Sequence, residues 1–370
     1  MLKDRILFVG IGQCGNNLVK QMEDLDYNVF YINTSYDDLK PLDTDGSKVY
    51  HIPNAKGCAK DRDKALNYAV GYWNDMANAI DSKFPTFDIV YFVYSLGGGT
   101  GGGISNILLD VISSKNPNKF YNVISVLPKD KESILVHSNA RESLKQLVEL
   151  EDKIYSIHLL DNNKSNEDDF SDINEEFAML FDRFISFNET SVKGNIDEEE
   201  LEKLATDSGI SIIIEFDHED FKQGLAEAIN NSIYADWNTN CNYLGVILKD
   251  NNSKDKCLDI IEDNFGIPLA DFTTFSNDSN LIIATGIEFN DSLTRKLGKL
   301  AKRKLQRKQE LEAERLDDEE IEDDFDEEIN IKEIIQPKTN KKKDKNSNKN
   351  NRKKVSLSEL DSIIEKYRNK

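Results

Sequence analysis

The chain has 370 residues, 38% of them hydrophobic, and a formal net charge of −21 at pH 7. This size and apolar content suffice for two packed domains, whereas the negative charge argues against a body that wraps DNA or anionic lipid. There is no apolar run of 18 or more residues, and a strand is predicted directly after the first residues, so we expect no membrane span and no signal peptide, and a cytoplasmic protein.

The first predicted strand, residues 5–9, runs into a glycine-bearing turn at residues 10–17, and a helix continues over residues 18–22. GxGxxG after a strand is, taken alone, a weak indication of a dinucleotide-binding turn. Such a site also needs an acidic residue at the end of the second strand to hold the ribose. The predicted second strand, residues 27–32, ends instead in Asn33, Thr34 and Ser35, which disfavours a nicotinamide cofactor.

The most informative stretch is residues 95–103, in which six glycines surround Thr100. An apolar run rich in β-branched and aromatic residues precedes it at 87–94, and apolar residues at helical spacing follow at 104–112. Without Cβ atoms, such a loop can turn several backbone N–H groups toward one anion, and the helix N-terminus adds the positive end of its dipole. We predict a phosphate-binding loop here, because flexible linkers rarely separate a buried strand from an apolar helix.

Strands and helices continue to alternate after this loop. Further segments are predicted as helices (64–80 and 134–149) and strands (121–128 and 153–160). Another helix, buried along one broad face, is predicted from the spacing of Phe177, Leu180, Phe181, Phe184 and Ile185. This alternation predicts an α/β fold with a mostly parallel sheet, covered on both faces, whose ligand sites lie at the carboxyl ends of the strands. From residue 209 the pattern changes to a smaller α+β module, and a long helix is expected over about 292–315.

Four stretches resemble the tubulin/FtsZ superfamily. Residues 97–103 match its signature GGGTGxG, GQCGNN at 12–17 is similar to the first nucleotide loop of tubulins, INTSYDDL at 32–39 to the second loop of FtsZ, and FSDIN at 170–174 to the start of the tubulin central helix. The resemblance implies a GTP-binding domain of tubulin/FtsZ type (1–168), a central helix (169–190), a GTPase-activating α+β domain (191–290), a long helix (291–316) and a disordered tail (317–370).

The resemblance also implies GTP and GDP as ligands, with Mg²⁺. The glycine loops would hold the phosphates, Glu132 the ribose, and an asparagine and an aromatic ring the guanine. Lys60 and Arg62 could neutralise phosphate charge or could simply be solvated. Cys14 is expected to pack rather than react, and the four cysteines lack zinc-ligand spacing, so no protein metal site is expected. The implied GTP-binding residues are Gly12, Gln13, Cys14, Asn17, Asn33, Gly57, Gly97, Gly98, Gly99, Thr100, Gly101, Gly102, Glu132, Asn162, Phe170 and Asn174.

Residues 195–200 fit the catalytic loop of the family, NxDxx(D/E), which implies Asp197 and Glu200 as the catalytic carboxylates. A merely solvated acidic helix N-terminus is the alternative. In the family this loop acts on the nucleotide of the next subunit, so the resemblance implies a head-to-tail homopolymer whose GTP hydrolysis depends on assembly. A Walker lysine motif is absent, so a P-loop mechanism is not supported.

The tail has three compositional parts. Ten of the twelve residues at 317–328 are acidic and nine of the seventeen at 338–354 are basic, which predicts disorder. Leu357, Leu360, Ile364 and Tyr367 share one helical face and predict a short docking helix, with a frayed end as the alternative. The basic tract could contact DNA directly or an acidic surface.

Among the branches of the family, the chain is most similar to the GTPases of low-GC bacterial plasmids and phages that move DNA with a centromere-bound adaptor. This similarity implies filaments that position plasmid or phage DNA, with the adaptor held by the tail and no membrane partner. An FtsZ-like division filament, a phage-spindle filament and a non-polymerising nucleotide-binding regulator are the alternatives.

Overall fold

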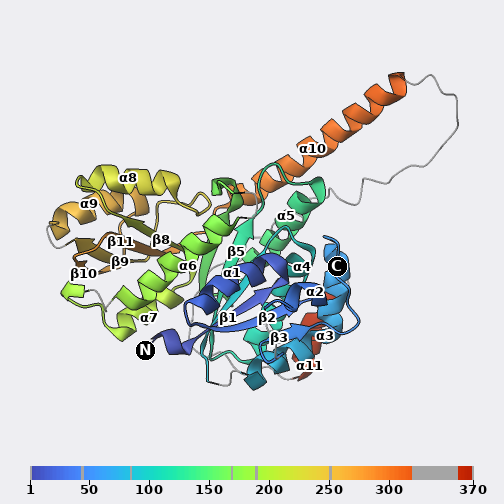
Figure 1. Cartoon of the computed structure of the whole chain (residues 1–370), viewed down its shortest axis with the longest axis horizontal. Coiled ribbons are helices and arrows are strands. Elements are labelled where there is room, and N and C mark those ends of the chain that lie inside the picture. The colour runs from blue at the N-terminus through green and yellow to red at the C-terminus, as the bar shows by residue number, and fades with distance from the viewer. Residues whose placement is uncertain are drawn as a thin grey trace.

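The computed structural model describes residues 2–42, 46–83, 86–167, 170–187, 191–249, 252–318 and 357–368 (Figure 1). At their centre is a sheet of eleven strands in the order β3-β2-β1-β4-β5-β6-β8-β11-β9-β10-β7. The strands are β1 (Ile6–Ile11), β2 (Asn28–Asn33), β3 (Val49–His51), β4 (Ile89–Ser95), β5 (Phe120–Leu127), β6 (Ser156–Asp161), β7 (Ser191–Lys193), β8 (Gly209–Phe216), β9 (Tyr243–Lys249), β10 (Ala270–Ser276) and β11 (Asn280–Ile287).

The strands of the first half of the chain are all parallel, as predicted. Each neighbour from β3 through β6 pairs in parallel, and β8 joins β6 in parallel through Ser156 with Gly209 and Ile157 with Ile210. Beyond that point β11 runs antiparallel to both β8 and β9. The smaller α+β part therefore continues the sheet of the first half.

Helices cover both faces of the sheet. Strand β1 connects through α1 to β2 on one side of it, whereas β4 connects through α4 to β5 on the other, so right-handed crossovers place α1 and α4 on opposite faces. Helix α6 contacts α1, and α3 and α5 contact α4. The helices are α1 (Gly12–Asp24), α2 (Tyr36–Leu39), α3 (Arg62–Lys83), α4 (Gly99–Lys115), α5 (Ile134–Glu149), α6 (Ser171–Ser186), α7 (Glu198–Thr206), α8 (Phe221–Asn231), α9 (Lys254–Phe265), α10 (Asp291–Asp318) and α11 (Leu357–Arg368), with 3-10 turns η1 (Leu2–Arg5) and η2 (Asn162–Lys164).

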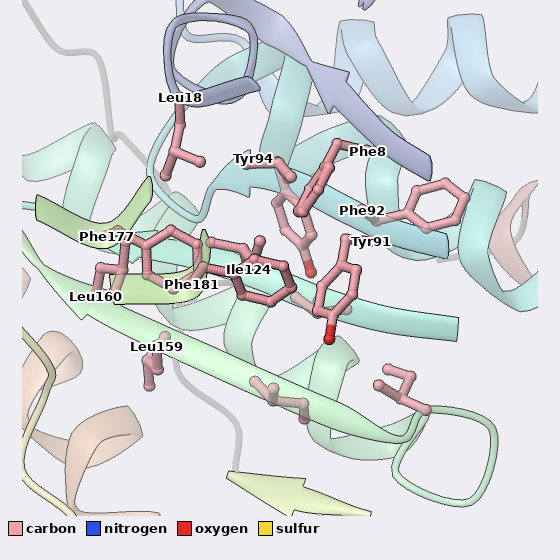
Figure 2. Packing of buried hydrophobic residues seen from close by; sticks show 14 of the residues in the cluster. Phe8, Leu18, Tyr91, Phe92, Tyr94, Ile124, Leu159, Leu160, Phe177 and Phe181 are labelled. Atoms are coloured by element: carbon pink, nitrogen blue, oxygen red, sulfur yellow. The ribbon is translucent and has the colours of Figure 1, made fainter. Parts of the chain in front are cut away.

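An aromatic cluster fixes α6 on the sheet (Figure 2). The ring of Phe181 lies 5.4 Å from Phe8 on β1 and 5.1 Å from Tyr91 on β4, both edge-on. The ring of His158 on β6 lies 6.0 Å from the same phenylalanine. Such edge-to-face pairs add about 0.5–1.5 kcal/mol each beyond the burial of their area. The predicted apolar face of α6 is buried, and Phe181 anchors this helix to β1, β4 and β6.

Some elements were not predicted. Strands β7 and β10 and the short elements β3 and α2 lack a long apolar run; β10 carries Asp271, Thr273 and Thr274 and is ordered by its parallel pairing with β9. The predicted long helix is present as α10, which packs on α5 and then extends away from the body (Figure 1). Of the predicted disordered tail at 317–370, residues 317–318 instead belong to α10. The rest of the acidic tract at 317–328 and all of the basic tract at 338–354 lie outside the described residues. None of the described helices is long and apolar enough to cross a bilayer.

Candidate functional site

A cavity of about 460 Å³ lies at the carboxyl ends of the parallel strands. Its lining includes residues within two positions of the ends of five neighbouring strands: Gly12 after β1, Thr34 after β2, Gly97 after β4, Pro128 after β5 and Asn162 after β6. In open parallel sheets this edge is where ligands bind, because every loop there starts from a fixed strand end. The fold therefore converges the glycine loops on one cavity, as the alternation of elements predicted.

Two glycine turns meet at the floor of this cavity. Helix α4 begins at Gly99 with Gly98 as its N-cap, and Gly97, Gly98, Thr100 and Gly101 all line the cavity. Gly12 has a φ of +77°, and a Cβ there would lie 3.1 Å from the backbone nitrogen of Gly101. Glycine is needed at position 12 both for this backbone conformation and for the close approach of the two loops. The helix N-terminus that they leave open toward the cavity is suited to bind an anion.

The loop before α3 forms a third side of the cavity, next to the two glycine turns. The N–H of Gly57 donates to the carbonyl of Thr34 at 2.8 Å, and Asn139 Nδ2 donates to the carbonyl of Lys60 at 2.8 Å. Lys60 lines the cavity, where its ammonium group can neutralise an anion. Arg62 turns away, because its Nε donates to the carbonyl of Gly102 at 3.1 Å and its Nη2 to Gln146. Arg62 thus ties α3 to α4.

Another part of the cavity lining combines an aromatic ring with a buried amide. Phe170, the N-cap of α6, and Asn162 both line it. Asn162 is only 6% exposed, and its Oδ1 has no hydrogen-bond partner among the described residues. A buried amide oxygen without a partner is unfavourable until a ligand donor reaches it. An aromatic ring beside such an amide can hold a planar nitrogenous base by stacking and by hydrogen bonding.

The charges around the cavity are of both signs. Asp38 and Glu132 line it together with Lys60, and Glu132 accepts a hydrogen bond from the N–H of Lys129 at 3.2 Å. Burial, with a smaller effect of the Glu132 carboxylate, raises the pKa of the Cys14 thiol to about 12. Cys14 therefore stays an uncharged thiol. The described residues contain no group of three or more His, Cys, Asp or Glu that could hold a metal ion.

Twelve of the sixteen predicted binding residues line this cavity, and four do not. Asn17 is exposed on α1. Gly99 and Gly102 face other backbone segments instead of the cavity: a Cβ on Gly99 would meet the backbone of Lys60, and a Cβ on Gly102 would meet the carbonyl of Leu96 at 2.6 Å. Asn174 is 8% exposed, and its N–H donates to the carbonyl of Phe170. Lys60, considered above as a cation for phosphate, also lines the cavity. The lining residues that were not predicted are Ile11, Thr34, Ser35, Asp38, Cys58, Ala59, Ser95, Val126, Pro128 and Val136.

Asp197 and Glu200 lie outside this cavity, at the start of α7. Asp197 Oδ1 accepts the N–H of Glu200 at 2.9 Å, and Glu200 Oε2 accepts the N–H of Asp197 at 2.9 Å. This reciprocal pair is a capping box, which satisfies two N–H groups of the helix end. The solvated helix N-terminus foreseen as the alternative is thus present, and both side chains remain accessible to solvent.

Helix α7 lies near the amino end of β1, whereas the cavity lies at the carboxyl ends of the parallel strands. Its Glu202 pairs with Arg5 at 2.5 Å, and Arg5 immediately precedes β1, whereas Gly12 immediately follows it and lines the cavity. A six-residue strand spans about 20 Å. The carboxylates of α7 and the cavity of the same chain therefore face opposite ends of the molecule.

Comparisons with known proteins match both halves of the chain. Residues 5–167 match the GTPase domain of the tubulin/FtsZ family, and residues 200–288 match the C-terminal domain of tubulin-like protein TubZ. Tubulin-like protein TubZ of Clostridium botulinum C phage is 37% identical over 318 residues, which cover 84% of this chain and 86% of that protein.

Solved structures agree with this assignment. The tail-truncated TubZ of Clostridium botulinum phage c-st superposes with a TM-score of 0.77 at 36% identity, covering 83% of this chain and 100% of that one. A protofilament of Bacillus thuringiensis serovar israelensis TubZ in its GTPγS form shares the fold, with a TM-score of 0.72 at 14% identity and coverage of 84% and 94%. The chain belongs to the tubulin/FtsZ family, and within that family to the TubZ proteins, with a GTPase domain in its first half.

Proposed function

We propose that the chain binds GTP in the cavity and hydrolyses it only in a head-to-tail polymer, in which Asp197 and Glu200 of one subunit complete the site of the next. The observation that carries this proposal is their location at the edge of the sheet opposite the cavity. Within one chain they cannot reach a phosphate bound at α4. A head-to-tail contact brings the two edges together at every interface.

The roles of the residues follow from their chemistry. The N-terminus of α4 and the ammonium of Lys60 would hold the phosphates, while Asn162 and Phe170 would hold the guanine. Asp197 and Glu200 would orient the attacking water, and a carboxylate in this role contributes about 10²–10⁴-fold to the rate. Mg²⁺ would be bound mainly by phosphate oxygens and water, with the hydroxyls of Thr34 and Thr100 nearby; when bound, it would neutralise charge on the phosphates.

The cellular role that we propose is the positioning or segregation of plasmid or phage DNA in the cytoplasm. The C-terminal tail would hold a DNA-binding, TubR-like adaptor, and the basic tract would add a weak direct contact with DNA. The similarity to the TubZ of a Clostridium botulinum phage supports this role. Removal of residues 337–370 should leave GTP-dependent pelleting intact and abolish capture of the adaptor–DNA complex; capture by the shortened chain would contradict this part of the proposal.

The mechanism is tested by measuring GTP turnover per subunit across protein concentrations, in parallel with GTP-dependent pelleting. Turnover should be near zero where no polymer pellets and should rise steeply once polymer forms, because the site is complete only at an interface. Turnover by dilute monomers that does not change with protein concentration would overturn the shared site.

A further inference from the structure

The C-terminal helix α11 is docked on the GTPase domain. It contacts α4 and α3 and lies far from the tip of α10 (Figure 1). Leu360, Ile364 and Tyr367, three of the four residues of the apolar stripe predicted for this helix, are each only 2% exposed. Ser362, Glu365 and Lys366 on its other side are exposed. We call the surface of α3 and α4 that α11 covers the α11 site.

A buried carboxylate gives this site a specific polar contact. The Tyr367 hydroxyl donates to Oδ2 of Asp110 at 2.9 Å, and Asp110, in the middle of α4, is 3% exposed. Oδ1 of the same carboxylate pairs with Lys153, whose ammonium also donates to Ser114 Oγ at 2.9 Å. Both oxygens of the buried Asp110 are therefore used, one of them by α11. An arbitrary apolar helix end would leave Oδ2 without this donor.

The length of α11 indicates that docking holds it folded. Helices shorter than about 12–15 residues are marginal in water on their own, and α11 has 12. The 38 residues between Asp318 and Leu357 can span at most about 130 Å when fully extended. This reach is ample for α11 to occupy the site on its own chain.

We propose that the α11 site is a docking surface whose occupant, in the unassembled subunit, is α11 of the same chain, and that this contact keeps the tail's apolar face from any other partner. The tail would then be available for capture only after α11 has left α3 and α4. The identity of the competing partner rests on the proposed function, whereas the docking itself does not.

Hydrogen exchange of the full-length chain, without nucleotide and below the concentration at which polymer pellets, tests the docking. The amides of residues 361–368 should exchange at least about tenfold more slowly than in a free peptide of residues 355–370, because a helix of this length is marginal alone. Ile364→Asp should remove the protection. Ser362→Asp, which adds the same charge on the exposed side of the same helix, should leave it in place. Tyr367→Phe should lower it about tenfold, the effect of losing one hydrogen bond to a charged acceptor.

Two further measurements identify the occupant. Protection by the chain's own α11 should not change on dilution, and an excess of the free 355–370 peptide should lower it by competing for the site. Exchange of residues 361–368 at the free-peptide rate would overturn the proposal, as would protection that disappears on dilution and so reports a second copy. GTP turnover and pelleting of the unaltered chain separate the two proposals. If α11 is protected but no polymer forms with GTP, only the proposed function is refuted.

Discussion

Asp197→Asn and Glu200→Gln separate the two roles that the acids of α7 can have. In the structure each carboxylate accepts the other residue's backbone N–H at 2.9 Å. Asparagine is as good an N-cap as aspartate, and glutamine can replace glutamate in a capping box. The two amide variants therefore keep the helix end and remove only the negative charges. Alanine at position 197 would confound the roles, because losing this cap alone costs about 0.5–2 kcal/mol.

If the carboxylates orient the attacking water, each amide variant should lose about 10²–10⁴-fold in GTP turnover, the usual contribution of a general base. The change in the free energy of unfolding should stay within about 0.5 kcal/mol, as for surface substitutions that keep their contacts. GTP affinity should not change, because the acids lie across the sheet from the cavity of the same chain.

The assay combines phosphate release above the pelleting threshold, urea denaturation, and titration with a fluorescent GTP analogue. Asp220→Asn is the matched control, because Asp220 caps α8 in the same way by accepting the N–H of Gln223 at 2.9 Å. It should leave turnover unchanged. Turnover of Asp197→Asn and Glu200→Gln within about threefold of the parent chain, with polymer still formed, would assign these acids to capping alone.

Three other changes probe the cavity and the core. Asn162→Ala should weaken GTP binding at least about tenfold in a fluorescence titration, because a hydrogen bond to the base is lost; unchanged affinity would remove this residue from the base site. Gly12→Ala should destabilise the fold by at least about 1–2 kcal/mol, since its φ of +77° is left-handed, and should impair GTP binding because a Cβ lies 3.1 Å from Gly101 N; a stable variant with normal affinity would contradict the contact between the loops. Burial lowers the pKa of His158 to about 3, so below about pH 6.5 the unfolded chain binds one more proton than the folded chain. The free energy of unfolding should therefore fall as the pH decreases, by about 1.4 kcal/mol per pH unit from this group. His158→Phe should remove this contribution to the pH dependence, as measured by urea titrations at pH 7, 6 and 5. An equal pH dependence in the variant and the parent chain would refute the role of His158.

The local patterns in the sequence were sufficient for the parallel sheet and for the position of the cavity. Alternating apolar runs and helical spacings are set by neighbours in the chain, so β4, α4 and β5 could be predicted around the glycine loop. A loop that starts at a strand end must also open at one edge of the sheet. These two facts required no knowledge of which distant segments pack together.

The orientation of individual residues depended on tertiary contacts and could not be predicted. Gly102 and Gly99 belong to the glycine loop but face Leu96 and Lys60 instead of the cavity. Of two neighbouring cations, Lys60 lines the cavity while Arg62 is held by Gly102 and Gln146. The periodicity of α11 predicted its apolar face, yet only the packed structure shows Asp110 as the acceptor for Tyr367.

The capping box is compatible with catalysis, because a carboxylate has two oxygens. The cap uses Oδ1 of Asp197 and Oε2 of Glu200, and no other described residue bonds Oδ2 of the first or Oε1 of the second. Each oxygen left over can accept a hydrogen bond from water. The cap also fixes both side chains on one turn of α7, so their free oxygens are positioned before any subunit docks. Preorganisation of this kind lowers the entropic cost of orienting the water, which predicts that weakening the cap with Asp197→Ala should harm turnover more than loss of the charge alone.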